Sequence, residues 1–434
     1  MINVLHLSNY DIRGGAAIAA YRIHKAIQRY SPNVSSHMLV AKKFSTDSSI
    51  QEFTLPPYQR QYLKLRNRIN SALSQSCKSE NPSLRSIAAL PSGLRRHLVE
   101  LYEDGKLDIL NLHWLGNSLL SIEEIGTLPF PVVWTAHDMW PFTGSEHYTY
   151  NPSSSSDSSH DKRYVSGYSR LNRPQYESGL DINRYTWHRK LRSWKSPITL
   201  IAPSQWMASS AQASALFLNS NVYTIPYPID RSIWFPINQE YARQSLNLPL
   251  TGKYILFGAD QADLDPRKGS DLLWNAISQL RHSPAMKNTS LISFGGSFIG
   301  HTTNYGLDHY SFGPVSVQET LNLLYSAADV LILPSRQDNL PNIGLEASAC
   351  GLPIIGFNTS GIPDIVSDGF NGFLATAFSI SSLAEKVTHL MSDYNLRAQF
   401  SKSALEKARS VWSPHKVGMS YQHAYYEILD DLSS

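Results

Sequence analysis

The stretch LILPSRQDNLPNIGLEASACGLPIIGFNTSG, residues 331–361, decides the fold of this chain. An apolar run at its start, residues 329–333, is typical of a buried strand. After a polar loop, we expect a helix whose first turn holds Pro341, because proline has no N–H and the first-turn amides have no helical partner anyway. This helix should end at about Cys350, since residues 351–353 form a Gly-Leu-Pro stop signal.

The second half of the stretch repeats the pattern. Residues 354–357 predict another buried strand, and Ser360-Gly361 predicts the start of a second, short helix. The two strand-to-helix turns should lie side by side, with free backbone N–H groups and the positive ends of two helix dipoles directed at one place. The sequence therefore predicts an anion site flanked by two acids, Asp338 and Glu346.

The spacing of Asp338 and Glu346, eight positions apart, resembles the acid-x7-acid signature of retaining nucleotide-sugar glycosyltransferases of the GT-B fold, glycosyl transferases group 1 or family 4. Pro334-Ser335 before the first acid and Gly351-x-Pro353 after the second fit the same signature. Family members usually have Glu at both positions, whereas the first acid here is Asp. The resemblance implies that Asp338 orients the donor sugar and that Glu346 holds the ribose hydroxyls. It also implies substrate contacts from Asn339, Leu340 and Asn342.

Bulk composition limits the class of protein. A chain of 434 residues exceeds one ordinary core, so two domains are predicted. Hydrophobic content of 42% and charged content of 17% indicate a globular protein, and a net charge of +3 gives no argument for nucleic acid. Cys77 and Cys350 form no metal or disulfide pattern. We see no signal peptide in residues 1–15 and expect a cytoplasmic protein, with peripheral contact at the inner face of the cell membrane left open.

The N-terminal part begins with an apolar run, Ile2–Leu7, which predicts a first parallel strand. Gly14-Gly15 follows, and residues 16–30 carry apolar side chains at helical spacing. Strand, glycines and helix together form a turn that suits a phosphate, although the three-glycine spacing of a dinucleotide site is absent. In the family that the chain resembles, this loop faces the donor phosphates and the acceptor, which makes Gly14 and Gly15 substrate-binding candidates.

His137 follows a predicted strand, residues 131–136, at the end where α/β sheets bind ligands. The resemblance implies a catalytic His close to the donor sugar and the acceptor. Residues 139–144, MWPFTG, resemble a subgroup used in bacterial surface-polysaccharide assembly, including exopolysaccharide and O-antigen synthesis. Further strands of this domain are predicted at His37–Ala41, Leu107–His113 and Ile198–Ala202, and Ser204 is predicted to cap a helix.

Two basic segments, residues 58–70 and 184–195, are interpreted as solvated helix faces. The alternative for the first is a patch for anionic lipid or for a diphosphate-carrying acceptor. Residues 151–160, NPSSSSDSSH, predict a loop. Prolines between residues 224 and 236 indicate a stiff interdomain connection. We therefore expect a first domain over 1–225, a nucleotide-sugar-binding domain over 226–411, and a C-terminal helix, 412–434, packed back on the first domain.

The second domain should open with a strand, residues 254–257, followed by Lys268 at a helix start. Family members have an Arg directly after the strand glycine and a Lys before a later glycine. Lys268 matches that Lys, whose implied role is catalytic neutralisation of the donor diphosphate, whereas Ala259 stands in the Arg position. Arg267 is a candidate for the missing charge. The alternative, a metal held by the D-x-D of residues 263–265, is disfavoured because a basic pair follows directly.

Another predicted strand, residues 291–294, ends at Gly295, a turn suited to close approach by a base or ribose. The rest of the domain is predicted as a helix over 315–328, a strand over 371–374 and helices over 379–392, 396–410 and 415–432.

The strand and helix pattern predicts an α/β protein, and the resemblance implies the GT-B fold, with two Rossmann-like domains facing a central cleft. It also implies a retaining hexosyltransferase without a cofactor, and the positive charge of Lys268 and the helix dipoles predicts that the enzyme is metal-independent. A UDP-sugar is the favoured donor and a GDP-sugar the second, and the acceptor is a saccharide or a polyprenyl-diphosphate-linked saccharide in surface polysaccharide biosynthesis. Two alternatives stay open: a nucleotide-sugar epimerase or hydrolase, and an inactive nucleotide-sugar-binding subunit. A dehydrogenase is disfavoured because no G-x-G-x-x-G follows a strand.

Overall fold

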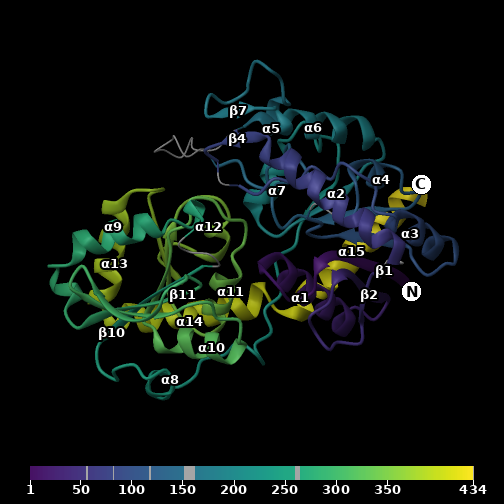
Figure 1. Ribbon diagram of the computed structural model, residues 1–434. Helices are drawn as coiled ribbons and strands as arrows, with labels where there is room; N and C mark the ends of the chain where they lie inside the picture. Colours follow the sequence, from purple (N-terminus) through teal and green to yellow (C-terminus); the bar gives the residue numbers. More distant parts are fainter. Residues whose placement is uncertain (55–56, 82, 117–118, 151–161, 260–263, 434) are drawn as a thin grey trace. The chain divides into compact units, whose positions relative to one another are not determined.

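The computed structural model describes residues 1–54, 57–81, 83–116, 119–150, 162–259 and 264–433. They form two compact units (Figure 1). Unit 1 comprises the described residues up to Pro228 together with the C-terminal segment from Pro414, and unit 2 runs from Ile229 to Ser413. The predicted loop 151–160 and Asp263 of the D-x-D lie outside the described residues.

Unit 1 is built on a seven-stranded parallel sheet with the strand order β3-β2-β1-β5-β6-β8-β9. The chain starts in the middle of this sheet, proceeds to one edge and then crosses to the other, as in doubly wound folds. Its strands are β1 (Ile2–Tyr10), β2 (Val34–Lys42), β3 (Ile50–Glu52), β5 (Ile109–Leu112), β6 (Val132–Thr135), β8 (Thr199–Ala202) and β9 (Val222–Thr224). β4 (Cys77–Ser79) and β7 (Glu177–Gly179) form a separate antiparallel pair.

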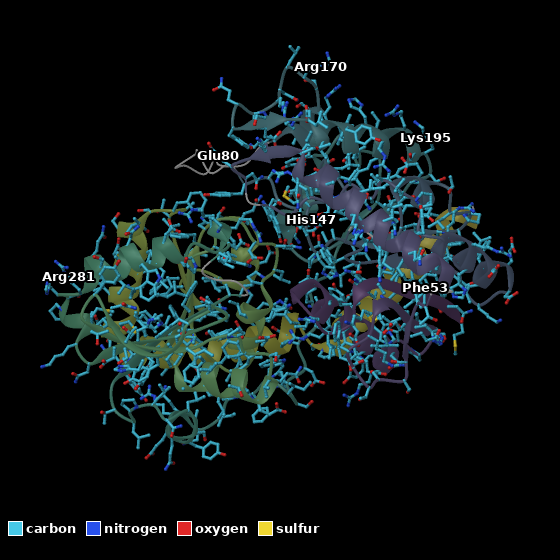
Figure 2. All side chains as sticks on the ribbon, viewed as in Figure 1. Phe53, Glu80, His147, Arg170, Lys195 and Arg281 are labelled. Carbon is cyan, nitrogen blue, oxygen red and sulfur yellow. The ribbon has the colours of Figure 1, made fainter. Side chains whose placement is uncertain are left out.

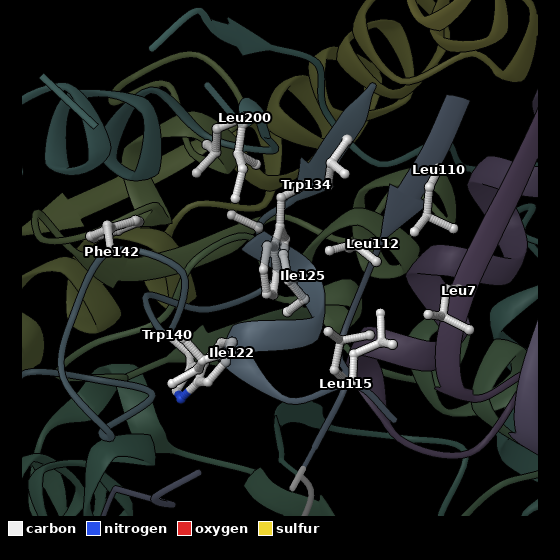
Figure 3. Packing of buried hydrophobic residues seen from close by; sticks show 14 of the residues in the cluster. Leu7, Leu110, Leu112, Leu115, Ile122, Ile125, Trp134, Trp140, Phe142 and Leu200 are labelled. Carbon is white, nitrogen blue, oxygen red and sulfur yellow. The ribbon is translucent and has the colours of Figure 1, made fainter. Parts of the chain in front are cut away.

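The core of unit 1 lies between the sheet and its helices. Strand leucines such as Leu7 and Leu112 pack with Ile122 of α4 and with Trp134 and Trp140 (Figure 3). Burying each side chain of this size stabilises the fold by about 1.5–3 kcal/mol. The helices are α1 (Gly15–Tyr30), α2 (Pro57–Gln75), α3 (Leu94–Glu103), α4 (Ile122–Gly126), α5 (Arg163–Ser166), α6 (Ile182–Ser193), α7 (Gln205–Gln212) and α15 (Pro414–Ser433).

The last helix, α15, lies along the first, α1. A Cβ at Gly418 would lie 2.7 Å from the carbonyl oxygen of Ala26, so glycine lets the two helices approach closely. The Ser31 hydroxyl donates to the Gly418 carbonyl at 2.8 Å. Further along α15, the hydroxyl of Tyr425 accepts a 2.7 Å hydrogen bond from the buried amide of Asn111. The C-terminal segment is therefore a structural part of unit 1.

Unit 2 has a second seven-stranded sheet with the order β12-β13-β11-β10-β14-β15-β16, in which only the edge pair β12–β13 is antiparallel. The strands are β10 (Lys253–Gly258), β11 (Thr289–Phe294), β12 (Ile299–Asn304), β13 (Leu307–Phe312), β14 (Val330–Leu333), β15 (Ile354–Phe357) and β16 (Gly372–Ala375). The helices are α8 (Gln239–Ser245), α9 (Ser270–Leu280), α10 (Gln318–Ala327), α11 (Asn342–Ala349), α12 (Ile362–Ile365), α13 (Ile380–Ser392) and α14 (Tyr394–Val411), with 3₁₀ turns at Pro266–Lys268 and Pro284–Met286.

The predicted α/β class with two Rossmann-like sheets is confirmed. The strands around the opening stretch are confirmed as β14 and β15, but Pro341 is the N-cap of α11 and lies outside its first turn. Strands β12 and β13 were missed, because their polar, glycine-interrupted sequence has no continuous apolar run.

The interpretation of both basic segments as solvated faces was partly wrong. Arg66 of α2 is buried, and its Nε donates to the Leu90 carbonyl at 2.7 Å. Lys190 of α6 is also buried and donates to the backbone carbonyls of Trp140, Thr143 and Gly144. Both side chains donate to backbone carbonyls, which leave no trace in the sequence pattern.

Other charged side chains do lie on the outside of the two units, as Figure 2 shows for Arg170, Lys195 and Arg281. None of the helices in the described part of the chain combines the length and the apolar character that crossing a membrane requires.

Candidate functional site

Lys268 and Asp338 are brought together by two neighbouring strands of unit 2. β10 pairs with β14 in parallel, so the loops that follow them leave the same edge of the sheet. Gly269 has a φ of +68°, and a Cβ there would lie 2.0 Å from the Pro334 carbonyl oxygen, so only glycine lets these loops touch. The Lys268 ammonium then donates to Asp338 Oδ2 at 2.6 Å; Lys268 stays partly accessible, whereas Asp338 is buried.

Arg267 and Arg336 brace the same two loops. The Arg267 guanidinium donates to Asp265 Oδ2 at 2.5 Å, and the Arg267 carbonyl accepts from the Arg336 amide at 2.7 Å. Arg336 forms a bidentate pair with Asp271 at 2.6 and 2.7 Å, and its hydrogen bond is the main reason that the pKa of Asp271 is lowered. Arg267 therefore lies beside Lys268 in sequence, but its own charge is already paired.

The expectation of free amides at Gly361 was wrong. The Gly361 N–H donates to the Asp338 carbonyl at 2.9 Å, and the next amide, of Ile362, donates to the Thr359 carbonyl at 3.2 Å. A Cβ at Gly361 would lie 1.4 Å from the Asn339 carbonyl oxygen, so this glycine serves loop packing. Since α12 is a single turn, the N-terminus of the eight-residue α11 is the better candidate for an anion here.

Glu346 lies on α11 and is only 4% exposed. Its Oε2 accepts a hydrogen bond of 2.7 Å from the Tyr325 hydroxyl. Tyr325 comes from α10 and packs against the rings of Trp234 and Phe294. A buried carboxylate held by a rigid aromatic hydroxyl has a fixed direction. Sequence reasoning missed Tyr325, because it lies inside an ordinary helical pattern 21 positions away.

The other predicted substrate contacts of unit 2 lie near these groups in the chain. Asn339 and Leu340 are buried directly after Asp338, and Asn342 is the first residue of α11. Gly295 has a φ of +88°, and a Cβ there would lie 1.9 Å from the Ala259 carbonyl oxygen. The ends of β10 and β11 therefore meet closely at Gly295.

The Gly14-Gly15 turn of unit 1 begins α1, with Gly14 as the N-cap at a φ of +90°. A Cβ at Gly14 would meet no heavy atom within 4 Å, so the backbone conformation and not crowding requires glycine. Asp11 fixes the loop, because its carboxylate accepts from the amides of Phe44 and Ser45 at 2.9 and 2.8 Å. The result is an exposed turn at the N-terminus of a long helix.

His137 lies directly after β6 and is 8% exposed. Its Nδ1 shares a 2.7 Å hydrogen bond with the Tyr227 hydroxyl, and its Nε2 shares one of 2.9 Å with Nδ1 of His113. Nε2 of His113 is in turn 2.9 Å from Nδ1 of His6. Burial lowers the pKa of His137 to about 4. Both ring nitrogens of this candidate are thus engaged within unit 1, by partners that sequence reasoning missed.

Beside His137 lies a small pocket lined by Trp114, Asp138 and His147 among others, whose volume of about 10 Å³ admits about one water molecule. His147 bonds Asp138 at 2.5 Å and Ser86 at 2.7 Å. Burial alone would raise the pKa of Asp138, but the pairing with His147 lowers it overall. The order Ser, His, Asp is that of a hydrolase triad, but Ser86 is 0% exposed, so no substrate can reach its hydroxyl.

Among the described residues, no three His, Cys, Asp or Glu side chains are grouped as a metal site would require.

Comparisons with known proteins point to one family. Residues 238–407 match the model "Glycosyl transferases group 1". A D-inositol 3-phosphate glycosyltransferase from Acidothermus cellulolyticus is 28% identical over 200 residues, which is 43% of this chain and 44% of that protein. An N-acetyl-alpha-D-glucosaminyl L-malate synthase from Bacillus anthracis is 28% identical over 114 residues, 26% of this chain and 30% of that protein. The chain thus spans less than half the length of these curated relatives.

Solved structures resemble the whole chain. Sucrose-phosphate synthase from Thermosynechococcus elongatus superposes with a TM-score of 0.66 at 14% identity, covering 99% of this chain and 100% of that one. HepE from Anabaena, solved with UDP and glucose, gives 0.59 at 16% identity with both chains fully covered. WaaG, a glycosyltransferase of lipopolysaccharide biosynthesis, gives 0.60 at 15% identity, covering 96% and 98%. The chain therefore has the GT-B fold, and its residues 238–407 match the glycosyl transferases group 1 model.

Proposed function

We propose that this protein is a retaining glycosyltransferase that moves a sugar from a nucleotide-diphosphate donor to a saccharide or lipid-linked saccharide acceptor. The observation that carries the proposal is the Lys268–Asp338 pair at 2.6 Å, held at the carboxyl edge of the unit 2 sheet inside the matched region 238–407. An ammonium group has three N–H donors, so the bond to Asp338 directs the group and leaves donors for a diphosphate. Asp338 would in turn orient the sugar through its hydroxyls.

The donor would be held by unit 2. Glu346, fixed by Tyr325, offers a buried carboxylate that suits the two hydroxyls of a ribose. The N-terminus of α11, where Asn342 lies, would add a positive dipole to the charge of Lys268. UDP-sugars are the favoured donors, because HepE was solved with UDP and UDP-glucose, and GDP-sugars are the second choice.

Breaking the sugar–phosphate bond leaves negative charge on the departing diphosphate. Lys268 would stabilise that charge, a contribution of the kind that is usually the largest in such reactions. The acceptor hydroxyl would attack from the face that the nucleotide leaves, with the departing phosphate as base, so that the anomeric configuration is retained. His137 and the Gly14-Gly15 turn are the proposed contributions of unit 1. We propose that turnover needs no metal ion, since a lysine and backbone dipoles supply the positive charge.

A surface of α2 supports peripheral contact with an anionic membrane. Tyr62, Leu65 and Ile69 are exposed and recur at helical spacing, and Lys64 and Arg68 are exposed beside them. The α2 sequence contains no acidic residue. An exposed apolar stripe with cationic flanks is the pattern of helices that lie in a bilayer surface. This supports a lipid-linked acceptor and a role in surface polysaccharide biosynthesis.

A panel of nucleotide sugars tests the proposal. Thermal shift should select a UDP-sugar, and incubation with saccharide, polyprenyl-linked and inositol-phosphate acceptors should yield an α-linked product from an α-linked donor, with an unchanged rate in excess EDTA. An inverted product would contradict retention, and loss of the rate in EDTA would contradict metal independence. Release of free sugar or an epimer in every reaction would favour the hydrolase or epimerase, and stabilisation without any conversion would favour a binding subunit.

A further inference from the structure

Three histidines of unit 1 form a continuous hydrogen-bonded chain. They come from three adjacent parallel strands: His6 lies in β1, His113 follows β5 and His137 follows β6. Each neighbouring pair is joined at 2.9 Å, from Nδ1 of His6 to Nε2 of His113, and from Nδ1 of His113 to Nε2 of His137. The rings are also stacked, with centroids 5.2 and 5.1 Å apart. The chain continues through Nδ1 of His137 to the Tyr227 hydroxyl.

Burial keeps all three imidazoles neutral near pH 7. It lowers the pKa of His137 to about 4 and holds the pKa values of His6 and His113 well below their usual range, with smaller contributions from neighbouring histidines. A neutral imidazole has one N–H and one bare nitrogen. Each link therefore has one donor and one acceptor, and the direction of one link fixes the direction of the next.

His6 sets that direction. Its Nε2 is fully buried and has no hydrogen-bond partner in the described part of the chain. A buried N–H without an acceptor is rarer than a buried acceptor without a donor, so the proton of His6 belongs on Nδ1. His6 then donates to His113 Nε2, His113 donates from Nδ1 to His137 Nε2, and His137 carries its own proton on Nδ1 and donates to Tyr227.

We propose that His6 and His113 are positioning residues for His137, which they hold in the Nδ1–H tautomer and in one ring orientation. The proposal rests on the proposed function, because only a role of His137 in sugar transfer makes its tautomer matter for turnover. It adds to that function two buried residues, neither of which is assigned to substrate. In a neutral histidine, the hydrogen bond at one ring nitrogen determines whether the other ring nitrogen carries the proton.

Two substitutions of His113 separate positioning from packing. The amide of Asn reaches the place of the imidazole Nδ1, so His113→Asn keeps the donor to His137 and loses the bond to His6. The amide of Gln reaches the place of Nε2, so His113→Gln keeps the bond to His6 and loses the donor to His137. Each variant removes one of two hydrogen bonds, so their melting temperatures should fall by similar amounts.

His24 provides a matched control. It is fully buried, and its ring centroid lies 5.7 Å from that of His6. Its ring nitrogens bond the hydroxyls of Ser36 and Ser49, which are not part of the row of hydrogen-bonded histidines. His24→Asn should lower the melting temperature and leave both the His137 resonances and kcat unchanged.

The first measurement is the imidazole nitrogen spectrum of ¹⁵N-histidine-labelled protein, with His137 assigned by the loss of its signals in His137→Asn. Wild type and His113→Asn should show the Nδ1–H tautomer of His137, and His113→Gln should show a second population protonated on Nε2. The second measurement is turnover: kcat of His113→Gln should fall about a hundredfold, the cost of misplacing a catalytic group, with KM for the donor little changed. His113→Asn should stay within a few-fold of wild type.

An Nε2–H tautomer of His137 in the wild type would overturn the proposal, as would identical His137 spectra or equal kcat values in the two His113 variants. If no donor and acceptor pair gives turnover, the proposed function fails, and the nitrogen spectra alone then decide whether the chain holds the tautomer of His137.

Discussion

The two units place their candidate groups in the same position, after parallel strands, but with opposite chemistry. Unit 1 uses buried, neutral imidazoles that are hydrogen-bonded in a row, and His137 is the most exposed of the three. Unit 2 uses charged groups, of which the central ones are the partly accessible Lys268 and the buried Asp338 that it pairs with. Burying an unpaired charge is costly, so the imidazoles that bond one another stay neutral, whereas Asp338 is buried with a cation beside it and the partly exposed Lys268 remains available to a charged ligand.

This difference predicts different sensitivities. The groups of unit 2 act through charge, so removing one charge should change chemistry more than stability. The groups of unit 1 act through hydrogen bonds between neutral rings, so protonation should change stability.

The largest effect is expected for Lys268→Ala. It removes the charge that would stabilise the departing diphosphate, and turnover should fall about 10²- to 10³-fold. Lys268 itself is partly exposed, so the fold should persist, with some loss of stability because the buried Asp338 loses its ion-pair partner. Steady-state kinetics with the donor found by thermal shift measures the change, and Lys287→Ala, at an exposed lysine of the same unit, is the control. Near-normal turnover would remove Lys268 from the mechanism.

The next effect is acid destabilisation of unit 1. In an unfolded chain a histidine binds a proton below pH of about 6.5. Burial lowers the pKa values of His24 and His137 to about 4 in the folded state. Between these values the unfolded state binds more protons than the folded state. The free energy of unfolding therefore decreases as the pH is lowered, by about 1.4 kcal/mol per pH unit for each such histidine.

Unit 2 should keep its stability to a lower pH than unit 1, because His309 is its only buried histidine among the described residues. The pKa of Asp271 in unit 2 is lowered below 3.8 by its bond to Arg336, so that contribution is lost only in stronger acid. Hydrogen-exchange protection factors at pH 7 and pH 5, corrected for intrinsic exchange rates, separate the units. Equal loss of protection in both would contradict the comparison.

The smallest effect is expected for Tyr325→Phe. It removes one hydrogen bond to Glu346, worth about 1 kcal/mol, so the Kd for the nucleotide should rise roughly fivefold. Calorimetry with the preferred nucleotide measures the change. Tyr254→Phe is a matched control, since this buried tyrosine of the same unit donates to the Pro249 carbonyl instead. A larger loss of nucleotide affinity in Tyr254→Phe than in Tyr325→Phe would show that the effect is structural.

Apolar runs and turn residues were enough to predict much of the fold. The strands at 330–333 and 354–357 and the helix after Pro341 follow from local pattern alone. The position of His137 at a strand end was also predictable, because it depends only on where β6 stops. The roles proposed for His137, Lys268, Asp338 and Glu346 remain predictions.

Contacts between distant segments could not be predicted in this way. Lys268 and Asp338 are separated by 70 positions, and His6 and His113 by 107. Their pairing depends on the strand order of each sheet, which a single sequence does not reveal. Arg66 and Lys190 were taken as surface charges because their acceptors are backbone carbonyls, which every residue has.

The return of α15 to unit 1 has a consequence for how the chain is made. Two groups of the unit 1 sheet, the Asn111 amide and the Thr135 hydroxyl, bond the hydroxyls of Tyr425 and Tyr421 on that helix. Residues 229–413 are contiguous, so unit 2 is complete in sequence before these tyrosines are synthesised. On a ribosome, which extends the chain from its N-terminus, unit 1 starts first but must wait for residues 414–433 to complete its contacts, so unit 2 can finish folding earlier.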